Sequence, residues 1–269
     1  GGTEGERARG RAPYLAKLLP GLFVSLLALA CGPGPEELRA RDPRPNVVII
    51  SMDTTRADHL SAYGYERDTS ASLRALAGEG MRFEVAYSPS ATTAPSHASL
   101  FTGLAPIAHG VVKNGRPLEG DFETLAETLG DEGYETAAVV SSYVLSGRFG
   151  FDQGFDHFDA DFSQADVVAG DRLWEGELLS GKFHGRADDT TRRGLQWLDA
   201  RRHPERPFFL FVNYFDPHTP YLPPEGYEPP FRPGAREALK LNRTIFLYDT
   251  LIAFTDQEIG RLLQGLEAR

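Results

Sequence analysis

The sequence is poor in cysteine: its 269 residues include only one, Cys31. A single cysteine cannot form a disulfide within the chain, so cysteine pairing says nothing about the compartment. Positive charge is also in the minority, with 28 lysines and arginines against 38 aspartates and glutamates and a net charge of −10. This balance argues against general nucleic-acid binding, which needs a basic surface. It does not exclude an anionic substrate, because a bound metal ion can reverse the sign of charge within a site.

An uninterrupted apolar run near the amino terminus is also lacking. Residues 18–30 are mostly apolar, but Pro20, Gly21 and Ser25 interrupt them. This stretch is short for a membrane span, which needs roughly 20 apolar residues. Basic residues precede it and small residues follow it. The pattern predicts a secretory signal over residues 1–31.

The end of this segment, Ala28–Gly32, resembles the lipobox of bacterial lipoproteins. In that motif the cysteine is lipidated and becomes the first residue of the mature protein, which implies lipidation of Cys31. The alternative is a plain signal peptide with an incidental cysteine. We expect an exported lipoprotein, anchored in the membrane and facing the periplasm or the cell exterior. Residues 32–45 are rich in proline and predict a tether.

Beyond the tether, strands and helices alternate. Continuous apolar runs at 46–52, 136–140 and 207–215 indicate strands buried on both faces, as in parallel sheets. Helical patterns occur at 70–77, 95–104, 121–129, 188–201 and 244–268, and residues 151–185 are expected to form long loops. We therefore predict an α/β domain over residues 46–269, with a mostly parallel sheet sandwiched by helices. Its ligand site should lie at the carboxyl ends of the strands.

Asp53 directly follows the first predicted strand. A carboxylate fixed at a strand end suits a hard cation, which takes oxygen ligands. The same aspartate could instead cap the following turn. Position alone does not separate these two interpretations.

Thr93 precedes Pro95, which is expected to help start a helix. Helix amino termini present free N–H groups and partial positive charge, which favour a bound sulfate or phosphate. A threonine hydroxyl becomes a nucleophile only when a base or a metal activates it. Alternatively, Thr92, Thr93 and Ser96 serve only to cap the helix.

His218 lies just past the third predicted strand, between Pro217 and Pro220. Prolines stiffen the turn, and a positioned imidazole can donate a proton or bond to a substrate oxygen. The alternative is a proline-rich surface loop. Asp53, Thr93 and His218 could all meet at one edge of the sheet, and this convergence favours a shared site over three separate structural roles.

Five sequence blocks stand out along the chain: Asn46–Tyr65, Thr93–Gly103, His109–Val111, Phe151–Asp156 and Asp216–Tyr221. In residues and order they resemble blocks of the sulfatase family, which belongs to the alkaline-phosphatase superfamily. The Thr93–Gly103 block resembles the family's nucleophile block, usually Cys-x-Pro-Ser-Arg before a helix that ends in Thr-Gly. The resemblance covers roughly residues 45–269.

The resemblance implies an alkaline-phosphatase-like fold and one divalent cation, held by Asp53, Thr54 and the nucleophile Thr93. The family would use Ca²⁺ in a sulfatase-like enzyme and Zn²⁺ or Mn²⁺ in a phosphoesterase-like one. Thr54 stands where the family has a second aspartate, so a hydroxyl replaces a carboxylate at that position. The resemblance also implies that His218 contacts the ester group.

The resemblance also places two further residues, His97 and Asn114, in the site. His97 stands in the catalytic block where the family has arginine. Asn114 matches a substrate-contacting asparagine of the phosphoesterase relatives. Because Gly115 follows it, Asn114 could equally be a turn residue.

The departures from the family pattern bear on the chemistry. Sulfatases oxidise their cysteine or serine nucleophile to formylglycine, and threonine cannot give that aldehyde, so no formylglycine is expected at Thr93. The family's Lys-x-His pair is replaced by uncharged residues at 141–145. The later Asp-His or Asp-Asn metal pair of the family does not occur in the sequence. We therefore expect a domain truncated at its carboxyl terminus and inactive as given.

The favoured hypothesis is a metal-dependent hydrolase of sulfate or phosphate esters that acts through Thr93. One alternative is a transferase of the phosphoryl or phosphoethanolamine type. Another is a non-catalytic, lipid-anchored protein that binds anionic glycans or lipids. The expected partners are an anionic ester on a glycan, lipid or small molecule, and the membrane through the anchor.

Overall fold

The computed structural model describes residues 44–162, 172–174, 177–179, 184–201, 203–233 and 240–269. The predicted signal peptide, Cys31 and all but the last two residues of the tether lie outside these residues. Residues Pro45–Arg269 form one compact unit. Within the described residues, none of the helices combines the length and the apolar character needed to cross a membrane.

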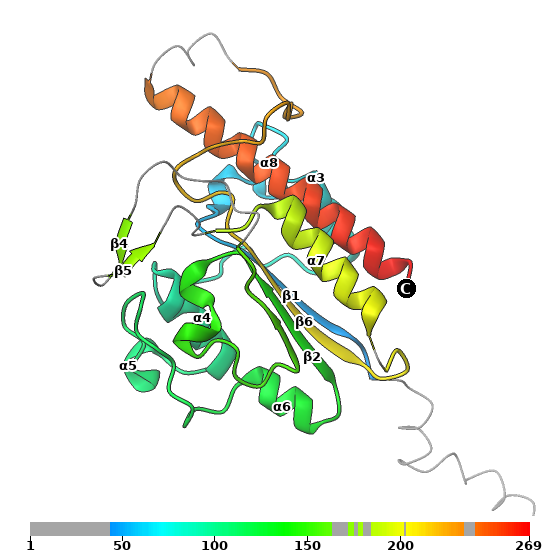
Figure 1. Ribbon diagram of the computed structural model, residues 1–269. Coiled ribbons are helices and arrows are strands. Elements are labelled where there is room, and N and C mark those ends of the chain that lie inside the picture. Colours follow the sequence, from blue (N-terminus) through cyan, green and yellow to red (C-terminus); the bar gives the residue numbers. More distant parts are fainter. Residues whose placement is uncertain (1–43, 163–171, 175–176, 180–183, 202, 234–239) are drawn as a thin grey trace, which may run out of the picture. The chain divides into compact units, whose positions relative to one another are not determined.

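Four parallel strands form the central sheet, in the order β1 (Val47–Met52), β6 (Phe208–Tyr214), β2 (Glu135–Val140) and β3 (His157–Asp159). The central strand β6 is buried along its whole length. The edge strand β1 is equally apolar but only half-buried, because β6 is its one partner among the described strands. The sheet places the carboxyl ends of β1, β6 and β2 side by side (Figure 1).

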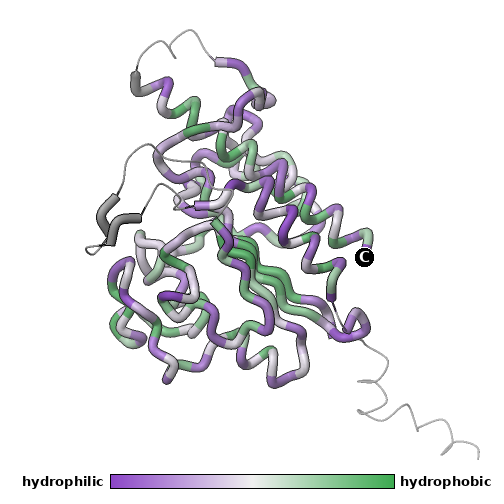
Figure 2. Tube along the Cα trace, in the orientation of Figure 1, coloured by the Kyte–Doolittle hydropathy of each residue, from purple (hydrophilic) through white to green (hydrophobic). Residues whose placement is uncertain are grey.

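Helices cover both faces of this sheet (Figure 1). The helices α4 (Thr93–Thr102), α5 (Pro106–His109) and α6 (Leu125–Asp131) lie on one side, and α3 (Ala71–Glu79), α7 (Ala187–Ala200) and α8 (Lys240–Glu267) lie on the other. Residues of β6 alternate between the two faces. Phe209 and Phe211 join the core under α4 and α6, whereas Leu210 and Val212 join the core under α7 and α8. The apolar band along the strands is visible in Figure 2.

The structure has elements that the sequence patterns did not predict. Residues 151–185, expected to be loops, contain β3 and the antiparallel pair β4 (Arg172–Trp174) and β5 (Glu177–Leu179). These strands are three residues long, too short for a periodic signal. Helix α6 begins at Leu125 rather than near 121, because Thr124 and Glu127 form a capping box. The short 3₁₀ helices are η1 (Ala57–His59), η2 (Ser61–Tyr63), η3 (Tyr143–Leu145) and η4 (Gly147–Phe149).

Candidate active site

Asp53 and Thr93 meet at the carboxyl edge of the sheet. Asp53 directly follows β1, and its backbone N–H donates to the carbonyl of Tyr214 at the end of β6, 2.8 Å away. Asp53 is 8% exposed, and its carboxylate accepts a hydrogen bond from the Thr93 hydroxyl, with Oγ1 3.0 Å from Oδ2. The sheet therefore fixes the carboxylate, and the carboxylate orients the hydroxyl.

Thr93 is the first residue of α4, not a residue ahead of it. The capping position is Thr92, whose side chain makes no capping hydrogen bond. The Thr93 hydroxyl is directed to Asp53 instead of to the helix backbone. Pro95, the third residue of the helix, has no N–H to offer. The helix-capping interpretation thus does not describe what the Thr93 side chain does.

Asn114 supplies the cap that Thr92 does not. Its side-chain oxygen accepts the N–H of Ala94, the second residue of α4, at 2.8 Å. It also lies in a turn, because the following Gly115 has a positive φ of 81°. The first three residues of α4 carry two N–H groups, because Pro95 has none. Asn114 accepts the N–H of Ala94, so the N–H of Thr93 is the other donor at this helix end. An anion at this helix end would therefore lie close to the Thr93 side chain.

His97 is buried beneath the first turn of α4. Its Nδ1 lies 2.8 Å from the Thr93 carbonyl oxygen and its Nε2 lies 2.8 Å from the Ser51 hydroxyl. A carbonyl only accepts, so Nδ1 donates and Nε2 accepts from Ser51. Burial lowers the pKa of His97, which favours this neutral form. Both nitrogens thus bond within the protein, so His97 is suited to positioning Thr93 rather than to contacting a substrate.

The turn after Asp53 is held by a tyrosine of α8. Thr54 has a φ of 54°, in the left-handed region that disfavours residues other than glycine. The Tyr248 hydroxyl donates to the Thr54 carbonyl at 2.8 Å and accepts the Arg56 N–H at 2.9 Å. Nearby, the fully buried Asp249 bonds to His59. Helix α8 therefore stabilises the backbone that carries Asp53.

His218 lies beyond β6 and is half-buried. Its ring stacks on Phe215, with centroids 4.3 Å apart and planes 16° apart. Its Nδ1 lies 2.6 Å from the carbonyl oxygen of Thr219, so Nδ1 carries a proton and Nε2 is left for another contact. Because β6 lies between β1 and β2, His218 belongs to the same edge as Asp53.

The chemistry of these donors suits a hard divalent cation only in part. The Asp53 carboxylate and the Thr93 hydroxyl are oxygen donors of the type that such cations take. The Thr54 carbonyl already accepts from Tyr248. Among the described residues there is no group of three or more histidine, cysteine, aspartate or glutamate side chains that could hold a metal. The described part of the chain therefore offers part of a ligand set.

Sequence reasoning missed three residues of this edge. Tyr248 and His184 gave no signal, because one lies within a helical pattern and the other precedes one. Asp216 was noted only as part of a motif. Burial raises the pKa of Asp216 to about 7, and its Oδ1 accepts the N–H of Ala187 at the start of α7, 3.0 Å away. Its Oδ2 is buried without a hydrogen-bond partner among the described residues.

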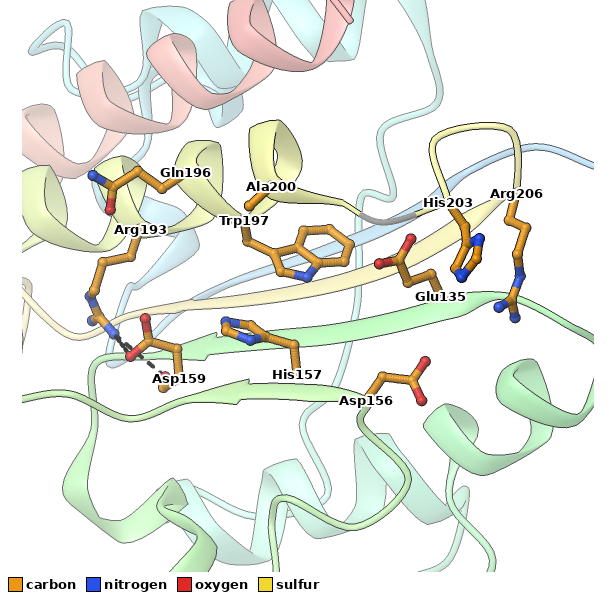
Figure 3. A pocket seen from close by; sticks show the side chains of 10 residues that line it. All are labelled: Glu135, Asp156, His157, Asp159, Arg193, Gln196, Trp197, Ala200, His203 and Arg206. Atoms are coloured by element: carbon orange, nitrogen blue, oxygen red, sulfur yellow. Dashed lines mark hydrogen bonds and ion pairs between the residues drawn. The ribbon is translucent and has the colours of Figure 1, made fainter.

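Two cavities help to delimit the site. A cavity of about 350 Å³ lies beside α4, with Ser51, Ser96 and His97 in its wall. A larger one of about 660 Å³ lies between α7 and the strands β2 and β3 (Figure 3). Glu135, which begins β2, and Arg206, which precedes β6, line the larger cavity. Its lining extends along β3 as far as Asp159 but includes none of Asp53, Thr93 and His218.

Comparison with known proteins places these residues in a family context. The family model described as Sulfatase matches residues 45–269. An N-acetylglucosamine-6-O-sulfatase of Bacteroides thetaiotaomicron is 28% identical over 209 residues, which are 77% of this chain and 36% of that protein. An arylsulfatase A of Bos taurus is 37% identical over 123 residues, 43% of this chain and 23% of that protein. The chain thus spans about a third or less of the length of these relatives.

Solved structures agree with the fold. A protein in complex with its substrate D-glucosamine-2-N,6-O-disulfate matches with a TM-score of 0.62 and 20% identity, over 84% of this chain and 62% of that one. The phosphonate monoester hydrolase of Agrobacterium radiobacter matches with a TM-score of 0.60 and 21% identity, over 84% and 60%. These matches and the parallel sheet between helices confirm the predicted α/β, alkaline-phosphatase-like fold.

Proposed function

The chain belongs to the sulfatase family, and from this membership we propose that Thr93 is the nucleophile of a hydrolase that cleaves sulfate or phosphate esters. The observation that carries the proposal is the 3.0 Å hydrogen bond from the Thr93 hydroxyl to Asp53 at the amino terminus of α4. A hydroxyl paired with a carboxylate is the arrangement of an activated nucleophile. The adjacent helix end favours the anionic part of the ester.

The residues suggest a double displacement. Thr93 Oγ1 loses its proton toward Asp53 and forms a bond to sulfur or phosphorus, while the bond to the ester oxygen breaks and its electron pair leaves with that oxygen. Nε2 of His218 bonds to the ester group. Water then attacks the sulfur or phosphorus atom, the bond to Thr93 Oγ1 breaks, and the hydroxyl regains a proton.

We further propose that Asp53, Thr93 and Thr54 contribute to a site for one divalent cation. The ion would be Ca²⁺ in a sulfatase-like enzyme and Zn²⁺ or Mn²⁺ in a phosphoesterase-like one. Such an ion would neutralise negative charge on the substrate and lower the pKa of the Thr93 hydroxyl. The remaining ligands would come from outside the described residues. No formylglycine is part of this mechanism, because threonine cannot form that aldehyde.

The test is turnover by the full-length protein after Thr93→Ala, assayed on aryl sulfate, phosphate mono- and diesters and a phosphonate. We expect kcat to fall by about four orders of magnitude, as for loss of a covalent nucleophile. Thr92→Ala is the matched control, since the Thr92 side chain makes no capping bond. That variant should stay within about threefold of the unchanged protein. Activity of Thr93→Ala equal to that of Thr92→Ala would reject the assignment.

The same panel distinguishes the substrate class. The proposed substrate is an anionic ester of a glycan, a lipid or a small molecule. The named relatives include sulfatases, and a phosphonate monoester hydrolase shares the fold. Preferential turnover of sulfate or of phosphate esters would decide between the two. Transfer of the group to an added alcohol in preference to water would support the transferase alternative.

A non-catalytic protein is the candidate of another class. The incomplete set of metal ligands among the described residues favours it. Binding of a sulfated oligosaccharide without turnover of any ester, in a full-length protein supplied with each cation, would support this alternative and reject the hydrolase.

We also propose export and lipid anchoring through Cys31. The basic, apolar and small-residue pattern of residues 1–31 supports this proposal. In a bacterial host, the protein should fractionate with membranes and incorporate labelled fatty acid. The Cys31→Ser variant should incorporate no labelled fatty acid. Equal labelling of both forms would contradict the assignment.

A further inference from the structure

The turn that carries His218 is built on the end of β6. Tyr214, the last residue of the strand, is fully buried, and its hydroxyl bonds to Thr191 of α7 at 2.7 Å. In the turn itself, the N–H of His218 donates to the carbonyl of Phe215 at 2.9 Å. The position of the His218 ring therefore depends on how the two residues enclosed by this turn are held.

Asp216, the first of these two residues, joins the turn to the start of α7. Its Oδ1 accepts the N–H of Ala187, the first residue of the helix, from 3.0 Å away. The start of α7 is also tied to β2, because the Gly185 N–H donates to the carbonyl of Ser141, just past that strand, at 2.8 Å. The start of α7 is thus bonded to the segments that follow both β6 and β2.

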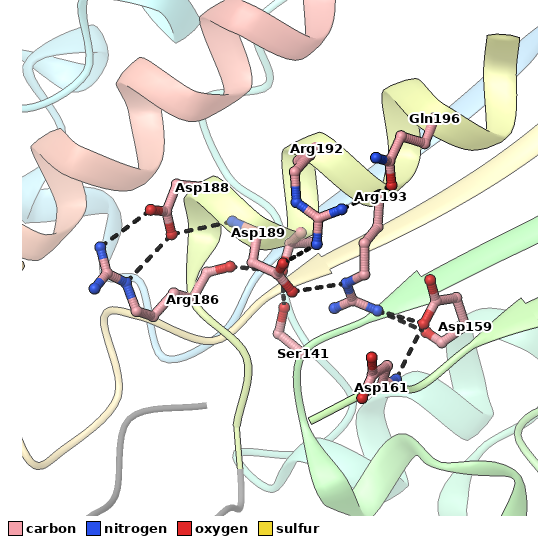
Figure 4. Close-up of polar contacts among 10 residues, drawn as sticks. Ser141, Asp159, Asp161, Arg186, Asp188, Asp189, Arg192, Arg193 and Gln196 are labelled. Carbon is pink, nitrogen blue, oxygen red and sulfur yellow. Dashed lines mark hydrogen bonds and ion pairs between the residues drawn. The ribbon is translucent and has the colours of Figure 1, made fainter. Parts of the chain in front are cut away.

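The side chains in the first turn of α7 are engaged in other contacts. Arg186, the capping residue, makes no capping bond with its side chain and donates to Asp188 instead. Asp188 also accepts the N–H of Asp189, which in turn pairs with Arg193 (Figure 4). Removal of the Asp216 carboxyl group would therefore leave a buried N–H at the start of α7 without its acceptor.

Stability alone does not account for a carboxyl group at position 216. Oδ2 of Asp216 is buried without a hydrogen-bond partner among the described residues. A buried, unpaired polar atom costs at least as much free energy as one hydrogen bond contributes. A native residue that carries such an atom calls for an explanation other than stability.

The other restraints on the His218 ring lie within its own segment. The ring stacks on Phe215 with centroids 4.3 Å apart, and its Nδ1 lies 2.6 Å from the carbonyl oxygen of Thr219. These contacts fix the ring relative to the turn. The bond from Asp216 to α7 fixes the turn relative to the helix. Nε2 of His218 is then aimed by both sets of contacts together.

We propose that Asp216 is a positioning residue for His218, and that its bond to the start of α7 sets the distance and direction from Nε2 to the ester group. The inference rests on the proposed function of Thr93 and His218. Asp216 exchanges no proton with the substrate and does not touch it. Because displacement of a reactive group by about 1 Å can lower a rate strongly, loss of this bond should weaken catalysis through His218.

A double-mutant cycle in the full-length protein tests this coupling, with a 4-nitrophenyl ester as the substrate. The assay is run at about pH 6, below the pKa of about 7 to which burial raises Asp216. Asp216→Ala should lower kcat/KM about tenfold or more, but only about twofold or less when His218→Ala is also present. Asp216→Asn keeps an oxygen for the Ala187 N–H and should stay within about threefold of the unchanged protein.

Thr124→Ala is the control, because it removes the side-chain cap of α6, on the other face of the sheet. It should lower stability in urea to a similar extent as Asp216→Ala. Its effect on kcat/KM should stay within about threefold and be the same with and without His218. Asp216→Ser, whose hydroxyl is one bond shorter, replaces Asp216→Ala if the alanine variant does not fold.

NMR of protein labelled with ¹³C-histidine gives a readout that needs no turnover. Asp216→Ala should shift the ring resonances of His218, whereas Thr124→Ala and Asp216→Asn should leave them in place. Unchanged His218 resonances in Asp216→Ala would overturn the proposal, as would equal losses of kcat/KM with and without His218. If the unchanged protein cleaves no ester, the proposed function fails and this inference fails with it. If it cleaves esters and the two losses are independent, only the inference fails.

Discussion

At the residue scale, the amino end of α4 depends on partners that are distant in the sequence. Thr93 bonds to Asp53 across 40 residues and Ala94 bonds to Asn114 across 20. The sequence motifs indicated Asp53 and Thr93, because each stands next to a recognisable strand or helix start. No local pattern could show that Asn114 caps α4 or that His97 bonds to Ser51, since these contacts exist only after the chain folds.

Asn114 allows capping and substrate effects to be separated. Asn114→Ala removes the acceptor of the Ala94 N–H and should lower the free energy of unfolding by about 1 kcal/mol. Asn114→Asp keeps an acceptor, so its stability should match that of the unchanged protein. Its added negative charge at the helix end should raise KM for an anionic ester about tenfold. Urea unfolding and steady-state kinetics measure the two effects. Equal destabilisation by both variants would contradict the capping role.

Asp216 predicts a pH dependence of stability. Burial raises its pKa to about 7 in the folded protein, against about 3.9 for an unfolded aspartate. Between these values the folded state holds a proton that the unfolded state has released. The free energy of unfolding should therefore fall as the pH rises from about 4 to about 7. Asp188 adds to this shift and Arg186 opposes it.

Asp216→Asn keeps an oxygen for the Ala187 N–H but cannot titrate. Its free energy of unfolding, measured by urea titration at a series of pH values, should not show the decrease between about pH 4 and pH 7 that comes from Asp216. Asp131→Asn changes an exposed aspartate at the end of α6 and serves as the control. A parallel pH profile for Asp216→Asn and the unchanged protein would refute the prediction.

At the element scale, the sequence predicted the long apolar strands and the amphipathic helices correctly in type and approximate place. β1, β2 and β6 are continuous apolar runs, and α7 and α8 carry a clear helical stripe. β3 was missed because three residues with polar neighbours give no period. Its position is fixed instead by pairing with β2, a tertiary contact. The start of α6 was misplaced because the Thr124 cap overrides the apolar spacing.

Gly154 holds the segment before β3 against the start of α6. It has a φ of 80°, and a Cβ there would lie 2.6 Å from the backbone nitrogen of Glu127. Gly226 has a similar φ of 78° with nothing within 4 Å. Gly226→Ala should cost about 1 kcal/mol from the left-handed backbone alone. Gly154→Ala adds the overlap and should cost about 3 kcal/mol or more.

Thermal or urea unfolding of the two variants gives this difference directly. Gly154 and Gly226 have similar backbone conformations. The extra loss of unfolding free energy in Gly154→Ala therefore measures the overlap of the new methyl group with α6. Similar losses of stability for both alanines would show that α6 moves to accommodate the methyl group.

At the scale of the whole molecule, apolar surface is concentrated in one extended segment. Met81, Phe83, Val85 and Tyr87 alternate with other residues and are 66–91% exposed. Such alternation is typical of a strand, yet no described strand pairs with this segment. Among the described strands, β1 also has a partner on one side only. Unpaired apolar strands are sites where chains associate.

We therefore expect the chain to self-associate as its concentration rises, which sedimentation velocity would detect. Phe83→Lys and Val85→Lys should weaken the association about tenfold or more. Leu222→Lys replaces an apolar residue that is 54% exposed outside the segment and is the control. A chain that stays monomeric at every concentration, or equal effects of all three lysines, would contradict this expectation.

The pairing of β1 with β6 has a consequence for biosynthesis. Asn46, which directly precedes β1, accepts a hydrogen bond from the N–H of Phe208 at the start of β6, 162 residues later in the chain. At about 5–20 residues per second, the ribosome completes β6 about 8 to 30 s after β1. During that interval the nascent chain carries an apolar strand without its partner. Asp53 can therefore take its place beside Thr93 only after β6 has been made, and a chaperone that shields β1 in the meantime would raise the yield of folded protein.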